Sequence, residues 1–386
     1  MRKVCVVTGT RAEYGIMQTL IKIISEDKDL DLQLVVTGMH LSPEFGLTYK
    51  EIEKDGFKIS KKVEMLLSSD SEVGILKSMG LAQIGFAEAF VELRPDIVLV
   101  LGDRYEIFSA VSAAMVSKIP VAHLHGGEAT EGLIDEPIRH SVTKMSHLHF
   151  TATETYRKRV IQMGENPERV FNVGTPLIDN ILKLDLLNRK NFEEAINFKL
   201  NEKNLMITFH PVTLEDNTAE KQFRELLEAI TGMGDTNFIF TKPNSDTNGR
   251  IIIQQIDDFV SKNPHRACAF TSLGQKRYLS ALSHVDVVLG NSSSGLTEAP
   301  SFKAATVDIG DRQKGRIKAT SVISCEPTKE SIGEALKKAF SKDFQSILKD
   351  VKNPYGEGGA SKRIVDVLKN FDYTNILKKK FYDIKF

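Results

Sequence analysis

The sequence has no excess of either charge, because its 51 acidic residues balance its 51 basic residues. This balance gives no indication of a nucleic-acid partner or a membrane surface.

Cysteine is scarce: the three cysteines, Cys5, Cys268 and Cys325, lie far apart and lack the close spacing of metal ligands. An odd number of isolated cysteines predicts reduced thiols in a cytoplasmic protein.

Long hydrophobic runs are also missing. No stretch reaches the roughly 20 apolar residues that span a bilayer. The apolar run behind the basic start, residues 3–9, is too short for a signal peptide, and we interpret it as the first strand. The turn that follows, residues 9–15, lacks the full G-x-G-x-x-G pattern, which disfavours a dinucleotide cofactor.

No complete set of metal ligands is present in the sequence. His123 and His125 alternate along one predicted strand, and His147 and His149 alternate along another, so each pair shares a face. Zinc would need a third convergent ligand and an open position. The pattern therefore favours histidines that lie in the core or have a fixed tautomer, and it predicts no metal and no cofactor.

What is present is an alternation of apolar, β-branched runs with amphipathic stretches. A chain of 386 residues exceeds the size of a single core, so we expect two domains. The alternation predicts an α/β protein with two Rossmann-like, parallel-sheet domains facing a central cleft. The turn residues 174–176 place the junction near residue 180, with domains at 1–180 and 181–359.

The elements follow from the period of the apolar residues. Strands are predicted at 3–9, 32–37, 97–101, 120–125, 147–153, 170–176, 204–211, 237–244, 266–273 and 286–290, and one within 305–316. Helices are predicted at 16–25, 69–94, 104–117, 134–145, 155–163, 218–231, 248–262, 275–283, 329–340 and 360–371. Asp70 or Ser71 is the expected cap of the long helix 69–94.

The stretch 96–141 carries the strongest functional signal. In open parallel sheets the carboxyl ends of the strands line the ligand crevice, and here these ends carry Asp103, His125 and Glu128, with Asp135 on the next helix. Neighbouring carboxylates in a closed cleft have their pKa values pushed apart, which gives one acid and one base. For Asp103 the alternative is a helix N-cap, a natural role for an acid directly after a strand.

The second half carries an anion-binding pattern. The turn 290–295 offers N–H groups and the hydroxyls of Ser292, Ser293 and Ser294 at a helix start, which suits a diphosphate. We favour this interpretation over a serine-rich N-cap, because one cap needs only one serine. Gly295 closes the turn.

Several other polar residues of this half have two interpretations each. Glu298 could accept hydrogen bonds from a ribose, or it is a solvated acid of a first helical turn. His210 follows a buried strand and is either functional or a structural hydrogen-bonding group. Arg312 and Arg316 could neutralise phosphate, or they belong to a solvated loop.

Eight motifs, taken in order, cover essentially the whole chain. They are Gly9 to Tyr14, Gly102 to Arg104, His125 to Glu128, Ile134 to His140, Thr143 to His147, Val173 to Pro176, His210 to Thr213 and Gly290 to Gly295. Each motif is weak alone, but the set is specific. Together they resemble the hydrolysing UDP-N-acetylglucosamine 2-epimerases of bacterial sialic-acid pathways and the epimerase half of the bifunctional animal enzyme.

This resemblance implies the GT-B fold, with a C-terminal helix, about residues 360–386, that joins the first domain. It implies no metal and no nicotinamide. The substrate implied is a UDP-sugar: the family removes UDP with loss of the C2 proton, forms a 2-acetamidoglucal, and adds water to give N-acetylmannosamine and UDP. A C2–H is a poor acid, so a placed carboxylate and a stabilised leaving group suit this step.

The resemblance also implies roles by position. Asp103 and Asp135 would be the acid/base carboxylates, and His210 would bind the diphosphate and assist its departure. The residues that would hold UDP are Arg11, Ser292, Ser293, Ser294, Gly295, Glu298 and Arg312, with Glu298 on the ribose. One position departs from the family: animal relatives carry a carboxylate where this chain has His125, so His125, Glu128 or Asp135 could partner Asp103.

The sequence leaves the substrate, the exact activity and the oligomeric state open. The same reaction could use UDP-2,4-diacetamido-2,4,6-trideoxyglucose, on the route to legionaminic acid. The chain could also be a non-hydrolysing epimerase, a GT-B glycosyltransferase or a non-catalytic sensor. The family suggests a homodimer or homotetramer. Residues 79–90 are apolar enough for an interface, and the basic, aromatic tail 378–386 is expected to pack on the first domain or on another subunit.

Overall fold

The computed structural model describes residues 1–67, 71–130, 134–211, 218–243 and 249–385. It divides into two compact units: unit 1 is formed by Met1–Leu182 and Gly358–Phe386, and unit 2 by Lys183–Glu357. Each unit has its own parallel sheet, which confirms the predicted α/β fold class. Within the described ranges, no helix is long and apolar enough to cross a membrane.

Unit 1 has a seven-stranded sheet in the order β3-β2-β1-β4-β5-β6-β7. Its strands are β1 Arg2–Thr8, β2 Leu30–Thr37, β3 Ile59–Val63, β4 Ile97–Leu101, β5 Val121–Leu124, β6 Leu148–Thr151 and β7 Val170–Asn172. The strand order reverses between β1 and β4, which pair directly in parallel. Ligands of open α/β sheets bind outside the carboxyl ends of the strands at such a switch point.

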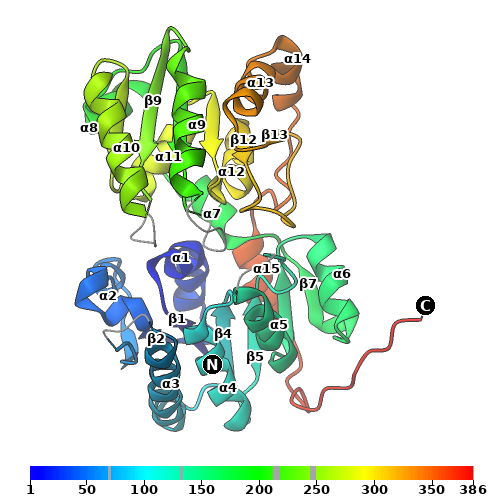
Figure 1. Ribbon diagram of the computed structural model, residues 1–386. Coiled ribbons are helices and arrows are strands. Elements are labelled where there is room, and N and C mark those ends of the chain that lie inside the picture. Colours follow the sequence, from blue (N-terminus) through cyan, green and yellow to red (C-terminus); the bar gives the residue numbers. More distant parts are fainter. Residues whose placement is uncertain (68–70, 131–133, 212–217, 244–248, 386) are drawn as a thin grey trace. The chain divides into compact units, whose positions relative to one another are not determined.

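Helices cover both faces of this sheet (Figure 1). They are α1 Arg11–Glu26, α2 Tyr49–Lys54, α3 Glu72–Leu93, α4 Tyr105–Val116, α5 Asp135–Met145, α6 Glu154–Gln162, α7 Pro176–Lys183 and α15 Ala360–Asn370. On one face Val4 and Val6 pack with side chains of α1 and α15. On the other face Cys5 and Val7 pack with α3 and α4, because successive side chains of a strand point to opposite faces.

Two helix starts show how local capping sets the boundaries. Helix α1 begins at Arg11, five residues before the predicted start, because the Thr10 hydroxyl accepts a hydrogen bond from the Glu13 amide at 3.3 Å. Helix α3 is capped by Ser71, whose hydroxyl accepts from the Gly74 amide at 3.1 Å. The alternative cap, Asp70, lies outside the described residues.

Unit 2 has a six-stranded parallel sheet in the order β10-β9-β8-β11-β12-β13. Its strands are β8 Lys203–Thr208, β9 Thr236–Thr241, β10 Ala267–Phe270, β11 Val287–Gly290, β12 Ala305–Ile309 and β13 Val322–Cys325. Its helices are α8 Arg189–Ile196, α9 Ala219–Thr231, α10 Gly249–Lys262, α11 Gly274–Leu282, α12 Ser294–Thr297, α13 Lys329–Ala339 and α14 Lys342–Leu348. Here the order reverses between β8 and β11, which again pair directly.

The C-terminal segment belongs to unit 1. The Asp179 carboxylate accepts hydrogen bonds from the first amides of the segment, among them Ser361 N at 2.6 Å, and α15 then packs against α1. The tail continues along the same unit: the Lys379 ammonium lies 2.7 Å from Glu165 Oε2, and the Tyr382 amide donates to the Gly164 carbonyl at 2.9 Å. The sequence predicted that the tail packs on the first domain or on another subunit, and the structure shows contacts with the first domain.

Candidate active site

Asp103 lies directly behind β4, at the switch point of the unit 1 sheet. Helix α4 begins at Tyr105, and the residue before it, Arg104, makes no side-chain cap bond. The interpretation of Asp103 as the N-cap of this helix is therefore wrong. The Asp103 carboxylate instead accepts a hydrogen bond from Arg139 and forms an ion pair with it.

Arg139 connects the polar groups of this edge. It lies on α5 and is 2% exposed, so its charge must be compensated inside the protein. Its guanidinium donates to a carboxylate oxygen of Glu136 at 2.7 Å, to the Thr130 hydroxyl at 2.9 Å and to the Glu128 carbonyl at 3.0 Å. With the bond to Asp103, these contacts hold the end of β4 against α5 and the loop before it.

Asp135 is the first residue of α5. Burial raises the pKa of its carboxyl, and the negative charge of Asp103 raises it further, against smaller opposing effects of Arg104 and Arg139. The carboxyl therefore keeps its proton to a higher pH than usual, which suits an acid/base group. The structure thus brings two of the predicted residues, Asp103 and Asp135, within electrostatic range of each other.

His125 and Glu128 form a second pair on the loop behind β5. His125 Nδ1 lies 3.2 Å from Glu128 Oε1, and its Nε2 lies 3.0 Å from the Thr175 hydroxyl. An ionised carboxylate only accepts, so Nδ1 donates to Glu128, and in the neutral ring Nε2 then accepts from the Thr175 hydroxyl, which itself accepts from the Leu177 amide at 3.2 Å. The His125 backbone is left-handed, with φ 67°, a conformation that non-glycine residues seldom adopt.

Sequence reasoning missed part of this edge. Arg139 and Glu136 lie in the predicted helix 134–145, but the sequence predicted no role for either of them, although their spacing on α5 allows the contact that the structure shows. Thr175 gave no signal beyond a turn. Two buried acids were also missed: Glu13 is 5% exposed, and burial, aided by the charge of Glu106, raises the pKa of Glu13 to about 8.

The neighbouring histidines have fixed tautomers, as the sequence predicted. His123 is fully buried; its Nε2 donates to the Gly102 carbonyl at 2.8 Å, and its Nδ1 lies 3.2 Å from the Thr143 hydroxyl. His149 Nε2 lies 2.9 Å from a carboxylate oxygen of Glu165. Among the described residues, no group of three or more His, Cys, Asp or Glu is arranged to hold a metal ion.

We expect His123 to make the protein less stable in acid. Burial lowers its pKa to about 3, so the folded state keeps it neutral while the unfolded chain binds a proton near pH 6.5. Its contribution to stability is complete above pH 6.5 and is lost as the pH falls from there toward 3. Between pH 7 and pH 5, His123→Gln should lose about 2 kcal/mol less unfolding free energy than the unmodified protein.

Urea denaturation at the two pH values measures this difference. The matched control is His265→Gln, because His265 is exposed and its replacement should leave the pH dependence unchanged. Equal losses for His123→Gln and the unmodified protein would contradict the prediction.

In unit 2, the carboxyl ends of β8 and β11 are held together. Gly290 ends β11 with φ 137°, and a Cβ there would lie 1.9 Å from the Thr208 carbonyl oxygen, so only glycine permits this close approach. The His210 amide donates to Asn291 Oδ1 at 2.8 Å, and Asn291 Nδ2 donates to the His210 carbonyl at 2.8 Å. His210 is thus fixed at the switch point of this sheet.

One serine of the turn acts as a helix cap, and the other two do not. Ser293, directly before α12, makes no side-chain cap bond, whereas the Ser292 hydroxyl accepts from the Ser294 amide at 3.4 Å. The Ser294 hydroxyl accepts from the Tyr278 hydroxyl at 2.6 Å, and the Thr306 hydroxyl donates to the Gly295 carbonyl at 2.8 Å. Since α12 has only four residues, its macrodipole is small, and an anion here would depend on amide and hydroxyl groups.

The remaining predicted UDP-binding residues differ in their surroundings. Glu298 is half-buried rather than fully solvated, and burial raises the pKa of its carboxyl although the Ser294 hydroxyl donates to it. Arg312 Nη1 donates to the Asn291 carbonyl at 3.1 Å. Arg11 is the first residue of α1; its side chain is 54% exposed and forms an ion pair with Glu51 at 3.3 Å.

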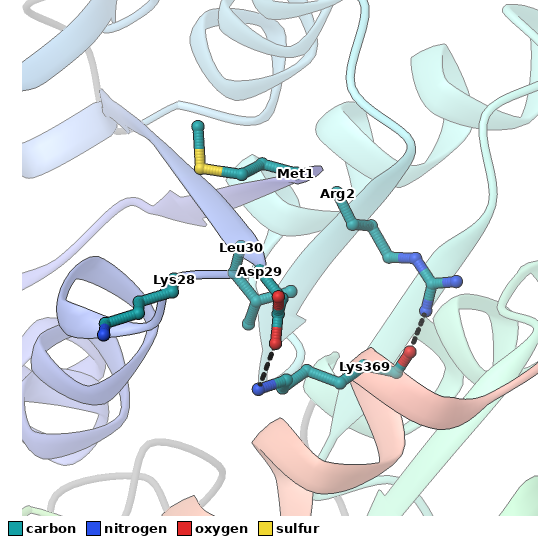
Figure 2. A pocket seen from close by; sticks show the side chains of 6 residues that line it. All are labelled: Met1, Arg2, Lys28, Asp29, Leu30 and Lys369. Atoms are coloured by element: carbon teal, nitrogen blue, oxygen red, sulfur yellow. Dashed lines mark hydrogen bonds and ion pairs between the residues drawn. The ribbon is translucent and has the colours of Figure 1, made fainter.

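Two cavities of unit 1 lie at the opposite edge of the sheet, near the amino ends of its strands. Figure 2 shows the first, of about 310 Å³, lined by Met1, Arg2, Lys28, Asp29, Leu30 and Lys369. Two of its charges form an ion pair, because the Lys369 ammonium lies 2.8 Å from Asp29, and Arg2 donates to the Lys369 carbonyl at 3.0 Å. The second, of about 690 Å³, includes Arg2, Asp96 and Tyr373. Neither cavity contains a predicted site residue.

Two Rossmann-type parallel sheets, each with polar side chains at its carboxyl edge, define an α/β protein of the GT-B-like class. The structure of UDP-GlcNAc 2-epimerase from Neisseria meningitidis bound to UDP-GlcNAc shares this fold, with a TM-score of 0.75 at 23% identity over 95% of this chain and 99% of that chain. A family model described as UDP-N-acetylglucosamine 2-epimerase matches residues 22–369. The chain therefore belongs to the UDP-N-acetylglucosamine 2-epimerase family, which confirms the resemblance found in the motifs, and it is an epimerase.

Two relatives show higher identity. One is GDP/UDP-N,N'-diacetylbacillosamine 2-epimerase (hydrolyzing) of Campylobacter jejuni, which is 45% identical over 384 residues, 99% of each chain. The other is polysialic acid biosynthesis protein P7 of Escherichia coli, which is 41% identical over 386 residues, 100% of this chain and 98% of that one. The similarity therefore extends over the full length of both chains in each comparison.

Proposed function

We propose that this protein is a hydrolysing 2-epimerase of UDP-2-acetamido sugars, which converts the UDP-sugar and water into the free C2 epimer and UDP. One observation carries the proposal most directly: Arg139 holds the Asp103 carboxylate within electrostatic range of Asp135, whose own pKa is raised. A carboxyl group with a raised pKa beside a second carboxyl group suits a reaction that removes and returns a C2 proton.

The proposed reaction has two steps. In the first, the C2–H and C1–O bonds break, a carboxylate of the Asp103 and Asp135 pair takes the proton, and UDP leaves with the electron pair, forming a 2-acetamidoglucal. In the second, the C1–C2 double bond breaks as the oxygen of water bonds to C1; water gives up a proton to a carboxylate of this edge, and a carboxyl group of the pair delivers a proton to C2 on the other face. His125, paired with Glu128, is the third acid/base candidate on this edge.

Unit 2 is the proposed UDP-binding domain. His210 and Arg312 would neutralise the diphosphate as it leaves, with Arg11 assisting from α1. The amides and hydroxyls of the serine turn, Ser292 to Gly295, would hold its oxygens. The raised pKa of the Glu298 carboxyl suits a buried hydrogen-bonding partner of ribose hydroxyls.

The choice of sugar rests on the relatives. The 45% identity to a hydrolysing diacetylbacillosamine 2-epimerase favours UDP-N,N'-diacetylbacillosamine, the 2,4-diacetamido-2,4,6-trideoxy sugar, as the substrate. The description of the matching family model, UDP-N-acetylglucosamine 2-epimerase, supports UDP-N-acetylglucosamine as the second candidate. The free thiols of all three cysteines are consistent with the cytoplasmic location predicted from the sequence.

A product assay tests both parts of the proposal. Each UDP-sugar is incubated with the protein in deuterated water, and NMR follows the free sugar, UDP and deuterium at C2. We expect free C2 epimer with deuterium at C2, formed faster from the diacetamido sugar. An epimerised but intact UDP-sugar would make the protein a non-hydrolysing epimerase. UDP release only with an acceptor would indicate a transferase, and binding without reaction would indicate a sensor.

We also propose that the protein self-associates through α3. Three exposed apolar residues lie along one side of this helix: Val73 (60% exposed), Ile84 (62%) and Val91 (72%). Gly80, between them, faces open space. In an antiparallel pairing of two copies, Ile84 packs on Gly80 of the partner subunit and Lys77 lies beside Glu88 of the partner subunit. The face is thus self-complementary in shape and charge, as a twofold interface requires.

The charge variant Ile84→Glu should convert a dimer into a monomer, because it places a carboxylate against Gly80 of the partner subunit and would bury that charge unpaired in the apolar contact. Sedimentation velocity on the full chain measures the change. Ile347→Glu is the matched control, since Ile347 is an exposed apolar residue of α14 in unit 2. A dimer that survives Ile84→Glu would exclude this face, and a monomeric unmodified protein would exclude self-association.

A further inference from the structure

Asn291 occupies the central position of the unit 2 edge. It follows β11 directly and is 1% exposed. In the sheet, β11 lies between β8 and β12, so the residues behind these two strands, His210 and Arg312, flank Asn291 on either side. In the proposed function, His210 and Arg312 are the groups that bind the diphosphate.

The side chain of Asn291 holds the His210 backbone at both of its polar groups. Its Oδ1 accepts from the His210 amide at 2.8 Å, and its Nδ2 donates to the His210 carbonyl at 2.8 Å. The pairing of β8 with β11 ends at Thr208 and Gly290, so beyond this point the Asn291 amide continues the hydrogen bonding that the strands no longer provide. The Asn291 amide therefore helps to set the position of the His210 backbone, and with it the direction of the His210 side chain.

The backbone of Asn291 binds the side chains behind β12, on the side away from His210. Its carbonyl oxygen accepts from Arg312 Nη1 at 3.1 Å and from the buried Gln313 Nε2 at 2.9 Å. Its own amide donates to the Thr208 carbonyl at 3.2 Å. A shift of Asn291 would consequently move His210 and Arg312 together.

We propose that Asn291 is the positioning residue of the diphosphate-binding edge, acting through His210 and Arg312 rather than by contact with the reacting atoms. The inference rests on the proposed function of unit 2. Only an amide side chain of this length both accepts and donates at residue 210, since a carboxylate cannot donate to the His210 carbonyl and would also bring a negative charge beside a diphosphate.

A matched control exists within the same unit. Asn204, at the amino end of β8, is 2% exposed and makes the same pair of bonds: its Oδ1 accepts from the Asn201 amide at 2.9 Å, and its Nδ2 donates to the Asn201 carbonyl at 3.0 Å. Asn204→Asp and Asn291→Asp therefore remove the same kind of donor at opposite ends of the sheet. A purely structural role predicts similar effects for both.

The experiment measures the thermal midpoint, the Kd of UDP by calorimetry, and kcat and KM on the substrate found in the product assay. We expect Asn291→Asp to weaken UDP binding at least about tenfold and to lower kcat at least about tenfold, since a charged hydrogen-bonding group is displaced. Asn204→Asp should lower only the thermal midpoint. In a His210→Ala background, Asn291→Asp should reduce kcat by a smaller factor than in the unmodified protein, because the part of its effect that acts through His210 is already lost.

Asn291→Asp with the UDP affinity and kcat of the unmodified protein would overturn the inference, as would equal losses for Asn204→Asp. If Asn291→Asp does not fold, Gln313→Leu removes one bond to the Asn291 carbonyl; an unchanged Kd for UDP in this variant would likewise contradict the inference. Failure of the unmodified protein to bind UDP would instead reject the proposed function.

Discussion

Asp103→Asn should lower kcat by about a thousandfold or more and leave the Kd of UDP within about twofold of its original value. The carboxylate of an acid/base pair contributes roughly 10² to 10⁴ to the rate, and the amide cannot take the C2 proton. The variant should stay folded, because asparagine can still accept the hydrogen bond from Arg139 that the structure shows. Turnover by NMR and UDP binding by calorimetry, on the same preparation, measure the two quantities.

The control for this result is Asp258→Asn, because Asp258 is an exposed acid of α10 in the other unit. Asp135→Asn is a second variant to compare with Asp103→Asn. The two carboxyls are proposed to share the proton transfers, so both variants should lose turnover. Retained turnover in Asp103→Asn would remove Asp103 from the chemistry and leave its contact with Arg139 as a structural feature. Loss of UDP binding in the same variant would mean that the defect is not confined to unit 1.

The location of these acids could be predicted from the sequence, but their partner could not. Asp103 and His125 were found because each directly follows a short apolar strand, and the carboxyl ends of parallel strands meet at one edge. Arg139 lies in the interior of a polar helix, 36 residues from Asp103, and its burial at 2% exposure has no counterpart in the sequence pattern. The N-cap alternative for Asp103 was reasonable locally and failed because α4 begins one residue later than the cap would require.

Parts of the fold could also be predicted from the sequence, and other parts could not. The central strands were predicted because both of their faces are buried, which leaves continuous apolar runs such as residues 97–101. Short elements were missed: α7, α8, α14 and the edge strand β13 have eight residues or fewer, too few to show a clear period. In unit 2, the approach of β11 to β8 at Gly290 and the role of Asn291 depend on distances between strands 80 residues apart, which no local pattern contains.

Arg139 is where stability and chemistry are most closely linked. Arg139→Met would leave the carboxylates of Asp103 (24% exposed) and Glu136 (27% exposed) without the guanidinium, and because these acids are partly solvated the cost should be about 3 kcal/mol, the lower end of the range for fully buried pairs. Arg139→Lys should recover part of this stability, because it restores the charge but not the planar fork that reaches several acceptors. Neither variant should turn over substrate at more than about a hundredth of the original rate.

A double variant separates the effect of Arg139 on stability from its effect on turnover. Asp103→Asn combined with Arg139→Met should unfold at a higher urea concentration than Arg139→Met alone, since one uncompensated charge has been removed, and yet remain inactive. Lys329→Met is the matched control: the Lys329 ammonium lies 3.6 Å from Glu228 with both side chains about half exposed, so its loss should cost under about 1 kcal/mol. If Arg139→Met were as stable as this control, Arg139 would not be compensating buried charge. If it also kept its turnover, Asp103 would not depend on Arg139, and the acid pair would have to be oriented by other groups on the same edge.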